Sequence, residues 1–233
     1  MIEEYKQHDR LLLAIDCIIF GFDGTRLKAL LVKRGFDPEK NKWSLIGGFV
    51  GKKEGVDEAA RRVLLELTGL DNIFMEQLHV FGDTNRDPGS RVVSVAYYAL
   101  IRIEDYAEEL MIAHNAHWVD VKRVPPLVFD HKKMLRMAQE RLRQKAANHP
   151  IGFELLPEKF TLPQLQLLYE AIYETELDKR NFSKKILSLG ILNKLDEKDH
   201  SSSRKGAYFY VFNRKKYREL DKQGFKLNTI TGL

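Results

Sequence analysis

The sequence predicts an α+β protein of two domains, and three features of the chain support this prediction. Its 233 residues exceed the common size of a single domain. Before residue 130, apolar runs of strand length mix with helical patterns without regular alternation, which favours a mixed sheet over a parallel βαβ sheet. From residue 130 the pattern changes to short amphipathic helices with basic faces. We therefore expect a mixed-sheet sandwich domain over residues 1–129, a linking helix over 130–149 and a second domain over 150–233.

The composition is that of an ordinary globular protein. Hydrophobic residues make up 44% of the chain and charged residues 30%, so disorder is not indicated. The apolar runs fall short of the roughly 20 residues that a membrane span needs, and the first residues lack the order of a secretory signal. Cys17 is the one cysteine, and its apolar surroundings predict a small buried residue. These features predict a cytoplasmic protein with no membrane partner.

The net charge is unevenly distributed along the chain. The formal charge is +5, and residues 151–233 contribute +4 of it with 15 basic and 11 acidic residues. The first 150 residues contribute only +1. A basic excess in the last third favours a polyanionic partner for that part of the chain.

The first domain is predicted to begin with a hairpin. Residues 11–20 (LLLAIDCIIF) and 28–34 (KALLVKR) are apolar runs of strand length, and FDGTR between them supplies turn residues. SLIGGFV then predicts a short strand with a glycine pair, and a helix follows near Val56. The segment 91–103 (RVVSVAYYALIRI) has the strongest strand pattern of the chain, and HNAHWVDV predicts one more strand before VPPL ends it.

A linking helix is predicted between Asp130, a candidate N-cap, and Pro150, which would end it. Its apolar face consists of Met134, Leu135, Ala138 and Leu142. We expect this helix to couple the two domains.

The elements that follow predict a winged helix-turn-helix domain. After the short apolar piece IGFELL, interpreted as a strand, Thr161 can cap a helix that has Pro163 in its first turn. A second helix is predicted from its cap at Asp178 to Gly190. ILNKL is then a strand, DEKDHSSSRKG a polar loop and AYFYVF a closing strand. The second helix of such a domain normally enters the major groove, so double-stranded operator DNA is the expected partner.

The segment 47–70 (GGFVGKKEGVDEAARRVLLELTGL) has the form of a metal-binding helix. Positions 63, 66 and 67 lie within about one turn, and carboxylates at all three could hold Mg²⁺ beside substrate phosphates. Here these positions are Val63, Glu66 and Leu67, with Glu54 shortly upstream. Two apolar side chains stand where ligands are needed, so we predict packing surface and no metal site.

This segment resembles the Nudix box, whose pattern is glycine, five residues, glutamate, seven residues, then Arg-Glu-apolar-x-Glu-Glu-x-Gly-apolar. The matching residues are Gly48, Glu54, Arg62, Leu64, Glu66, Gly69 and Leu70. The chain departs from the pattern at Val63 and Leu67, where the family has glutamates. The resemblance implies a Nudix-like fold, and the departures predict no catalytic residue, metal or cofactor. The alternative is an active Nudix pyrophosphohydrolase for ADP-ribose or a nucleoside diphosphate sugar, with two glutamates sufficing for the metal.

Nearly the whole chain resembles the Nudix-related (NrtR-like) transcriptional regulators. The similar segments are LLLAIDCIIF, LLVKRG, DTNRDPGSRVVSVAYYAL and FTLPQLQLLYEAIYETELDKRNFSKKILSLGIL. Members of this group respond to ADP-ribose-like nucleotides or to sugars, and the chain looks most like the arabinose-responsive (AraR) branch. The resemblance implies a repressor of sugar-utilisation genes that a pentose such as L-arabinose releases from DNA. A homodimer is expected, because two winged helices related by a twofold axis read the halves of a palindromic operator.

The candidate effector-binding residues follow from this resemblance and from their residue types. The planar guanidinium of Arg34 suits a bidentate contact to a carboxylate, phosphate or sugar diol, and the polar turn at 83–91 borders the substrate in the enzymes it resembles. The structural alternatives are a solvated Arg34, a Glu66–Arg62 ion pair and plain turn chemistry. The candidates are Lys33, Arg34, Gly48, Phe49, Glu66, Asp83, Asn85 and Arg86.

The candidate DNA-binding residues lie on the helix after Asp178 and in the loop before AYFYVF. Arg and Asn suit the edges of guanine and adenine, while Lys and Ser suit phosphates. The alternatives are a charged face that is only solvated and a winged helix that binds a protein. The candidates are Lys179, Arg180, Asn181, Ser183, Lys184 and Lys185 on the helix, and Arg204 and Lys205 in the loop.

Overall fold

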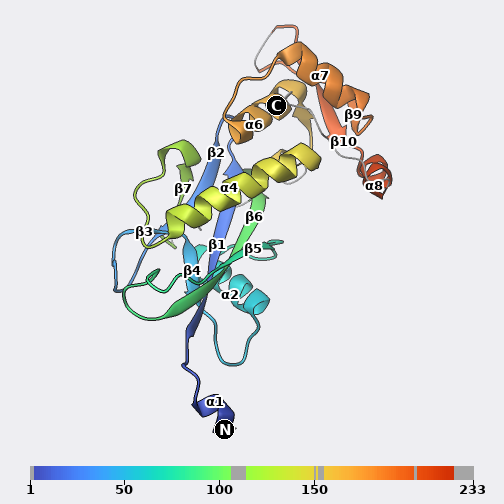
Figure 1. Ribbon diagram of the computed structural model, residues 1–233. Helices are drawn as coiled ribbons and strands as arrows, with labels where there is room; N and C mark the ends of the chain where they lie inside the picture. The colour runs from blue at the N-terminus through green and yellow to red at the C-terminus, as the bar shows by residue number, and fades with distance from the viewer. Residues whose placement is uncertain (1–2, 106–113, 150, 152–154, 202–203, 223–233) are drawn as a thin grey trace. The chain divides into compact units, whose positions relative to one another are not determined.

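The computed structural model of the protein (Figure 1) describes residues 3–105, 114–149, 151, 155–201 and 204–222. The chain divides into two compact units, each described here by itself. The first consists of Met1–Phe20, Ala29–Ala99 and Tyr106–Ala138, and the second of Gly21–Lys28, Leu100–Asp105 and Gln139–Leu233. The last boundary falls inside a continuous helix, which therefore belongs to both units.

The predicted hairpin is confirmed. Strands β1 (Leu12–Phe22) and β2 (Leu27–Lys33) are neighbours in the sheet. The carboxylate of Asp23 closes their turn by accepting the backbone N–H groups of Thr25 at 2.9 Å and Arg26 at 2.8 Å. From residue 14 to its end β1 is continuously buried, as expected of a strand covered on both faces. Cys17 lies in this stretch and is fully buried, as predicted, and burial raises the pKa of its thiol.

Seven strands of the described chain form one sheet. The order is β3-β2-β1-β6-β5, with β4 paired to β1 and β7 paired to β2. The remaining bounds are β3 (Trp43–Ser44), β4 (Ile46–Phe49), β5 (Glu76–Phe81), β6 (Val92–Arg102) and β7 (Ala116–Asp120). The sequence predicts neither β3 nor β5. Two residues are too few to show a pattern, and β5 ends the sheet order with only Leu78 and Phe81 buried.

The glycine pair and the helix after it occur as predicted. β4 runs antiparallel to β1, with Gly47 opposite Asp16. A Cβ at Gly47 would approach Asp16 Oδ1 to 2.3 Å, so a side chain does not fit there. Helix α2 (Val56–Thr68) ends at Gly69, whose φ of 73° is the left-handed conformation that favours glycine in a C-cap.

Helix α4 (His131–Asn148) lies in the segment that was predicted to be a linking helix. Its predicted apolar residues Met134, Leu135, Ala138 and Leu142 are buried, with 3% exposure or less. Asp130 precedes the helix, but its carboxylate binds Arg86, and its backbone carbonyl accepts the N–H of Lys133 at 2.8 Å. Pro150, predicted to end the helix, lies outside the described residues.

Within the described chain, no helix combines the length and apolarity that a membrane crossing demands.

The second unit contains the predicted pair of helices. Helix α6 (Leu162–Tyr173) begins at Thr161, whose hydroxyl accepts the N–H of Gln164. Helix α7 (Lys179–Ser188) begins at Asp178, whose carboxylate accepts the N–H of Asn181 at 2.8 Å. Both predicted caps are confirmed. They could be predicted because Thr and Asp have side-chain oxygens that accept the free N–H groups at the start of a helix.

A three-stranded sheet of order β8-β10-β9 completes this unit. β8 spans Phe160–Thr161, β9 spans Leu192–Asp199 and β10 spans Ala207–Phe212. The prediction of a strand in IGFELL (151–156) is wrong. Leu155 is helical, and the first strand of this sheet, β8, comes later in the chain. Residues 152–154 of this segment lie outside the described chain. β9 also runs beyond ILNKL, because backbone pairing with β10 continues through its charged residues.

Four further short elements were not predicted. A basic helix, α8 (Arg214–Lys222), follows β10, and the side chain of Asn213 caps it by accepting the N–H of Lys216 at 2.9 Å. The others are helix α1 (Glu3–Lys6) and the 3₁₀ turns Ile103–Asp105 and Val121–Arg123.

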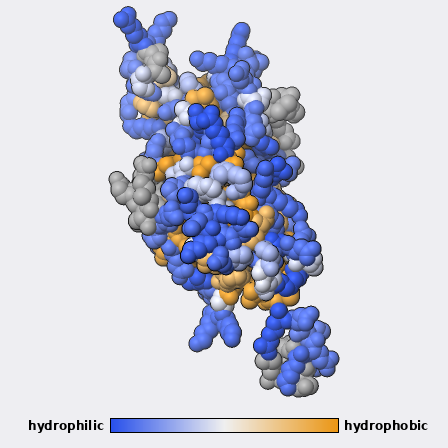
Figure 2. All heavy atoms as spheres, turned by 90° about the vertical axis from the view of Figure 1, so that its left-hand side faces the viewer, coloured by the Kyte–Doolittle hydropathy of each residue, from blue (hydrophilic) through white to orange (hydrophobic). Residues whose placement is uncertain are grey.

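The face shown in Figure 2 is mostly hydrophilic, with hydrophobic residues reaching the surface in separate patches. Among the large hydrophobic residues that stay exposed are Phe36 and Phe49, at 51% and 44%. Both border a pocket in the first unit, where an apolar rim suits ligand binding.

Candidate functional site

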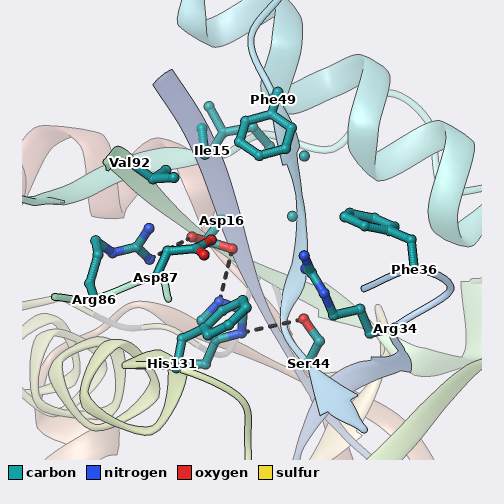
Figure 3. A pocket seen from close by; sticks show the side chains of 14 residues that line it. Ile15, Asp16, Arg34, Phe36, Ser44, Phe49, Arg86, Asp87, Val92 and His131 are labelled. Atoms are coloured by element: carbon teal, nitrogen blue, oxygen red, sulfur yellow. Dashed lines mark hydrogen bonds and ion pairs between the residues drawn. The ribbon is translucent and has the colours of Figure 1, made fainter. Parts of the chain in front are cut away.

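A pocket opens in the first unit where β1, β4, the 83–91 loop and the start of α4 meet (Figure 3). Its polar residues include Asp16, Arg86, Asp87 and His131. Its aromatic residues are Phe36, Phe49 and Phe129. The cavity measures about 40 Å³, room for a few waters or a single ligand group. A larger ligand would therefore insert one group and lie across the mouth.

Asp16 is buried in the pocket and bound from several elements. Its Oδ2 accepts the Ser94 hydroxyl at 2.6 Å, and its Oδ1 lies 3.4 Å from Nε2 of His131. Nδ1 of His131 accepts the backbone N–H of Leu45 at 3.1 Å, so the proton of the neutral ring sits on Nε2 and faces Asp16. Burial lowers the pKa of His131, which keeps this ring neutral near pH 7. The contact joins β1 to the first residue of α4.

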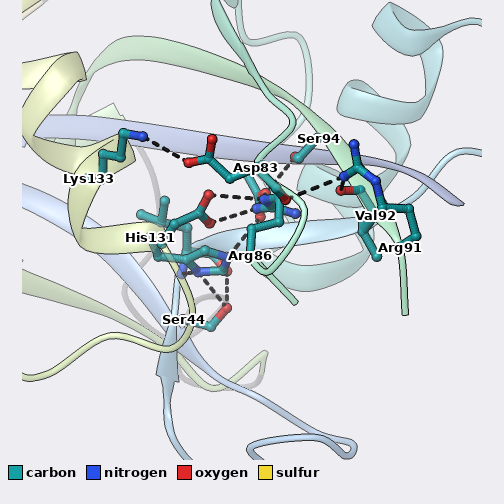
Figure 4. Close-up of polar contacts among 11 residues, drawn as sticks. Ser44, Asp83, Arg86, Arg91, Val92, Ser94, His131 and Lys133 are labelled. Atoms are coloured by element: carbon teal, nitrogen blue, oxygen red, sulfur yellow. Dashed lines mark hydrogen bonds and ion pairs between the residues drawn. The ribbon is translucent and has the colours of Figure 1, made fainter. Parts of the chain in front are cut away.

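Arg86 makes a second connection between the pocket and α4 (Figure 4). Its Nε and Nη2 donate to the two oxygens of Asp130 at 3.0 and 2.8 Å, and its side chain is 3% exposed. Lys133 and Asp83 also link this loop to α4, 3.1 Å apart, but they are 59% and 72% exposed. Exposed pairs contribute at most about 1 kcal/mol, whereas removing one partner of a buried pair costs about 3–5 kcal/mol. The buried pair of Arg86 and Asp130 is therefore the more important of the two ion pairs that join the 83–91 loop to the start of α4.

Arg34 follows β2 and extends into the same pocket (Figure 3). Its guanidinium lies 4.0 Å from the ring centroid of Phe36 and 5.0 Å from that of Phe129. Nε donates to the carbonyl of Pro38 at 2.6 Å, and this is the one hydrogen bond of the guanidinium within the part of the chain that the structure describes. Partial burial lowers the pKa of Arg34. A half-buried cation with unused N–H groups favours an anionic ligand.

The residues of the Nudix-box segment are arranged around Arg62. Its guanidinium donates to Glu54 at 2.9 and 2.6 Å and to Glu66 at 3.0 Å, so the Glu66–Arg62 pair weighed from the sequence is present. The hydrogen bond from Arg62 lowers the pKa of Glu54 to about 2. Val63 is 2% exposed. Two carboxylates that already bind a guanidinium do not fit the oxygen cluster that Mg²⁺ requires. No group of three His, Cys, Asp or Glu residues in the described chain is placed to hold a metal ion.

The structure brings together half of the candidate effector-binding residues. The four that line the pocket are Arg34, Gly48, Phe49 and Arg86. The four that do not line it are Lys33, Glu66, Asp83 and Asn85.

Local geometry explains these four positions. Successive residues of a strand point to opposite faces, and Lys33 lies over the ring of Trp43, 5.3 Å from its centroid. Glu66 is exposed beside Arg62 on α2. Asp83 binds Lys133 at the surface, and Asn85 is exposed.

The sequence missed Asp16, His131 and Phe129 as pocket residues. A single acid inside the apolar run of β1 was the available signal for Asp16, because a buried carboxylate requires partners. His131 and Phe129 carried no such signal. Their place in the pocket depends on how the start of α4 meets the sheet.

In the second unit, α7 has one buried and one solvent-facing side. Phe182 and Ile186 are buried, and the ring of Phe182 lies 5.6 Å from that of Tyr169 in α6. The exposed candidates are Lys179, Arg180, Asn181 and Lys184 on the helix, and Arg204 and Lys205 before β10, while Ser183 and Lys185 are half-buried. Six of the eight candidates are therefore exposed to solvent, as contact with DNA requires.

The hairpin of β9 and β10 places two lysines beside one aromatic ring, a cluster that the sequence did not single out. Nζ of Lys194 lies 3.4 Å from the ring centroid of Tyr208, and Nζ of Lys198 lies 4.6 Å from it. Tyr208 is 38% exposed, so two cations and an aromatic ring face solvent together.

Two family profiles match the chain. One described as NUDIX domain matches residues 10–138, and one described as NrtR DNA-binding winged helix domain matches residues 152–212. Their order along the chain agrees with the predicted order of the two domains.

Two curated relatives resemble the chain. The ADPR responsive transcriptional repressor NtrR of Acinetobacter baylyi is 33% identical over 202 residues, which cover 84% of this chain and 81% of that protein. The ADP-ribose pyrophosphatase of Methanocaldococcus jannaschii is 32% identical over 138 residues, which cover 58% of this chain and 77% of that protein.

Solved structures of Shewanella oneidensis NrtR resemble the chain as well. The complex with a 27mer DNA has a TM-score of 0.74 at 30% identity and covers 88% of this chain and 95% of that one. The NUDIX domain complexed with ADP ribose has a TM-score of 0.53 at 31% identity and covers 61% of this chain and 99% of that one.

Proposed function

The chain belongs to the NrtR-like family of Nudix-related transcriptional regulators, and from this premise we propose that it represses transcription in response to ADP-ribose or a close nucleotide relative. The α+β fold, a Nudix domain followed by a winged helix domain, is confirmed. The identity of the effector is what we propose. It is supported by the name of the Acinetobacter baylyi repressor and by the ADP ribose complex of the Shewanella oneidensis Nudix domain.

The proposal of an anionic effector rests on the position of Arg34. Its guanidinium is half-buried between Phe36 and Phe129, with N–H groups available in the pocket. The glycines of β4 beside it let a ligand approach the backbone closely. A phosphate oxygen inserted into the pocket would accept from Arg34 and neutralise its charge, and the rest of the nucleotide would lie across the aromatic rim.

The pentose expected from the sequence resemblance stays a prediction. The relatives reported above are named for ADP-ribose or for regulation, and none is named for a sugar. A neutral sugar can accept a hydrogen bond from Arg34 but adds no negative charge to that of nearby carboxylates such as Asp87, so it attracts the guanidinium less strongly than a phosphate does. L-Arabinose is therefore the competing effector in the experiment below.

We further propose that the Nudix domain acts as a sensor and not as a catalyst. Glu54 and Glu66 both bind Arg62, and Val63 packs against the sheet, so the donor set for Mg²⁺ is incomplete. The alternative, hydrolysis of ADP-ribose, is favoured by the similarity to the Methanocaldococcus jannaschii pyrophosphatase.

For the winged helix domain we propose that α7 enters the major groove and that the β9–β10 hairpin contacts the backbone. The exposed residues of α7 include Arg180 and Asn181, which can read base edges, and Lys184, which suits a phosphate. A homodimer on a palindromic operator accounts for both half-sites.

The test is fluorescence anisotropy with labelled DNA from the region upstream of the protein's own gene. We expect ADP-ribose to change the operator Kd by about 5-fold or more and L-arabinose to leave it unchanged. If the operator Kd changes with L-arabinose and not with ADP-ribose, the effector is the pentose and the proposal of ADP-ribose is wrong. The same protein incubated with Mg²⁺ and ADP-ribose is expected to release no product, and steady multiple turnover would establish the hydrolase.

A further inference from the structure

Arg86 is shared by two carboxylates that belong to different elements. Its Nε and Nη2 bind both oxygens of Asp130, and the same Nη2 lies 3.4 Å from Oδ2 of Asp16 (Figure 4). We call Asp16, Arg86 and Asp130 the Arg86 bridge. The single N–H of Nε and the two N–H groups of Nη2 each face a carboxylate oxygen, so an acceptor that binds Arg86 at either nitrogen has to replace one of these contacts.

The Arg86 bridge joins the pocket to the start of α4. Asp16 and Arg86 line the pocket, and so does His131, the first residue of the helix. Asp130 immediately precedes it. α4 continues past residue 138, where the first unit ends, to Asn148 in the second unit. The contacts that hold residues 130 and 131 therefore position the beginning of a helix that both units share.

The two carboxylates differ in their remaining partners. Asp16 also accepts the Ser94 hydroxyl at 2.6 Å and faces Nε2 of His131 at 3.4 Å. In the described part of the chain, the Asp130 carboxylate has Arg86 as its one hydrogen-bonding and ion-pairing partner. An acceptor that takes the N–H groups facing Asp130 therefore leaves that carboxylate without its partner, whereas Asp16 keeps its contacts with Ser94 and His131.

We propose that Arg86 is a positioning residue that transmits effector binding to α4, because an effector oxygen bound by Arg86 displaces Asp130 and frees the first turn of the helix. This inference rests on the proposed function, since it requires an anionic effector in the pocket and a DNA affinity that responds to it. Beyond that function, the inference names Arg86 and Asp130 as the side chains that transmit the response.

The experiment measures coupling in the full-length protein, as the ratio of operator Kd values with and without saturating ADP-ribose. Asp130→Asn preserves the shape of the side chain but weakens its attraction for Arg86. We expect the free variant to bind operator as ADP-ribose-saturated wild type does, so the ratio falls from about 5-fold or more to below about 2-fold. Its affinity for ADP-ribose should equal or exceed that of wild type, because no charged competitor has to be displaced.

Lys133→Gln is the matched control, because Lys133 and Asp83 join the same loop to the same helix at the surface. Its coupling ratio should stay within about 2-fold of wild type, as expected for an exposed pair. An Asp130→Asn protein with wild-type coupling overturns the inference. Reduced affinity for ADP-ribose in that variant overturns it too, since a merely structural role for Asp130 would weaken binding.

Arg86→Lys provides a second measurement if Asp130→Asn does not fold. Lysine keeps a positive charge near Asp16 but lacks the planar fork that binds both oxygens of Asp130. We expect coupling below about 2-fold at saturating ADP-ribose, and wild-type coupling refutes the inference. Wild-type protein whose operator affinity ignores ADP-ribose would instead refute the proposed function, which separates the two failures.

Discussion

Val63 lies so close to Gly48 that a Cβ at residue 48 would approach its Cγ2 to 2.8 Å. The valine is 2% exposed, so helix α2 is held against β4 by an apolar contact at a position where the Nudix-box pattern has a glutamate. This contact depends on glycine at residue 48, because a side chain there would collide with the valine.

Gly48→Ala is expected to destabilise the protein by about 1–3 kcal/mol, because the added methyl overpacks against Val63. Val63→Ala in the same chain removes the colliding methyl groups. The double variant should therefore lose less than the sum of the two single losses in the free energy of unfolding, measured by urea denaturation. Strict additivity would show that the two side chains do not collide.

Arg34→Gln is expected to weaken ADP-ribose binding by about 10- to 100-fold, the range of a lost charged hydrogen bond. Isothermal titration calorimetry measures the change. The control is Lys33→Gln, because Lys33 lies over Trp43 and does not line the pocket. Equal losses in both variants would mean that general positive charge, and not the placed guanidinium, attracts the ligand.

Two substitutions on α7 separate base reading from phosphate contact. Arg180→Ala should lower the preference for operator over unrelated DNA by about 1–3 kcal/mol, while Lys184→Ala should weaken binding to both alike. The dependence of log Kd on log salt should also become shallower by about one for Lys184→Ala. Anisotropy titrations at several salt concentrations measure both effects. The assignment fails if Lys184→Ala alone alters sequence preference.

The buried His131 predicts a loss of stability in mild acid. Burial lowers its pKa in the folded protein below the usual 6.5, although Asp16 and Asp130 oppose this and Arg86 and Arg34 add to it. Below about pH 6.5 the unfolded chain binds a proton that the folded chain refuses, so stability falls as the pH decreases.

His131→Asn removes this titration while its amide oxygen can still accept the N–H of Leu45. Between pH 7.5 and 5.5 wild type should lose about 1 kcal/mol more unfolding free energy than the variant. Chemical denaturation at the two pH values compares them. Parallel losses would show that His131 is not the group responsible.

Patterns that repeat within a few residues were enough to predict much of the fold. The hairpin turn at Asp23, the caps Thr161 and Asp178 and the apolar face of α4 all follow from local rules. The wing strand β9 was predicted too short, because its charged residues are held by pairing with β10 and not by burial.

The sequence by itself determined the order of the two domains, the departures at Val63 and Leu67 and the exposed basic side of α7, since each depends on residue type and short spacing. Only the tertiary structure decided that Asp16, Arg86 and His131 meet in one pocket while Lys33 and Asn85 stay outside it. These residues come from separate segments of the chain. Their meeting depends on strand order and on where α4 begins, which no local period of side chains encodes.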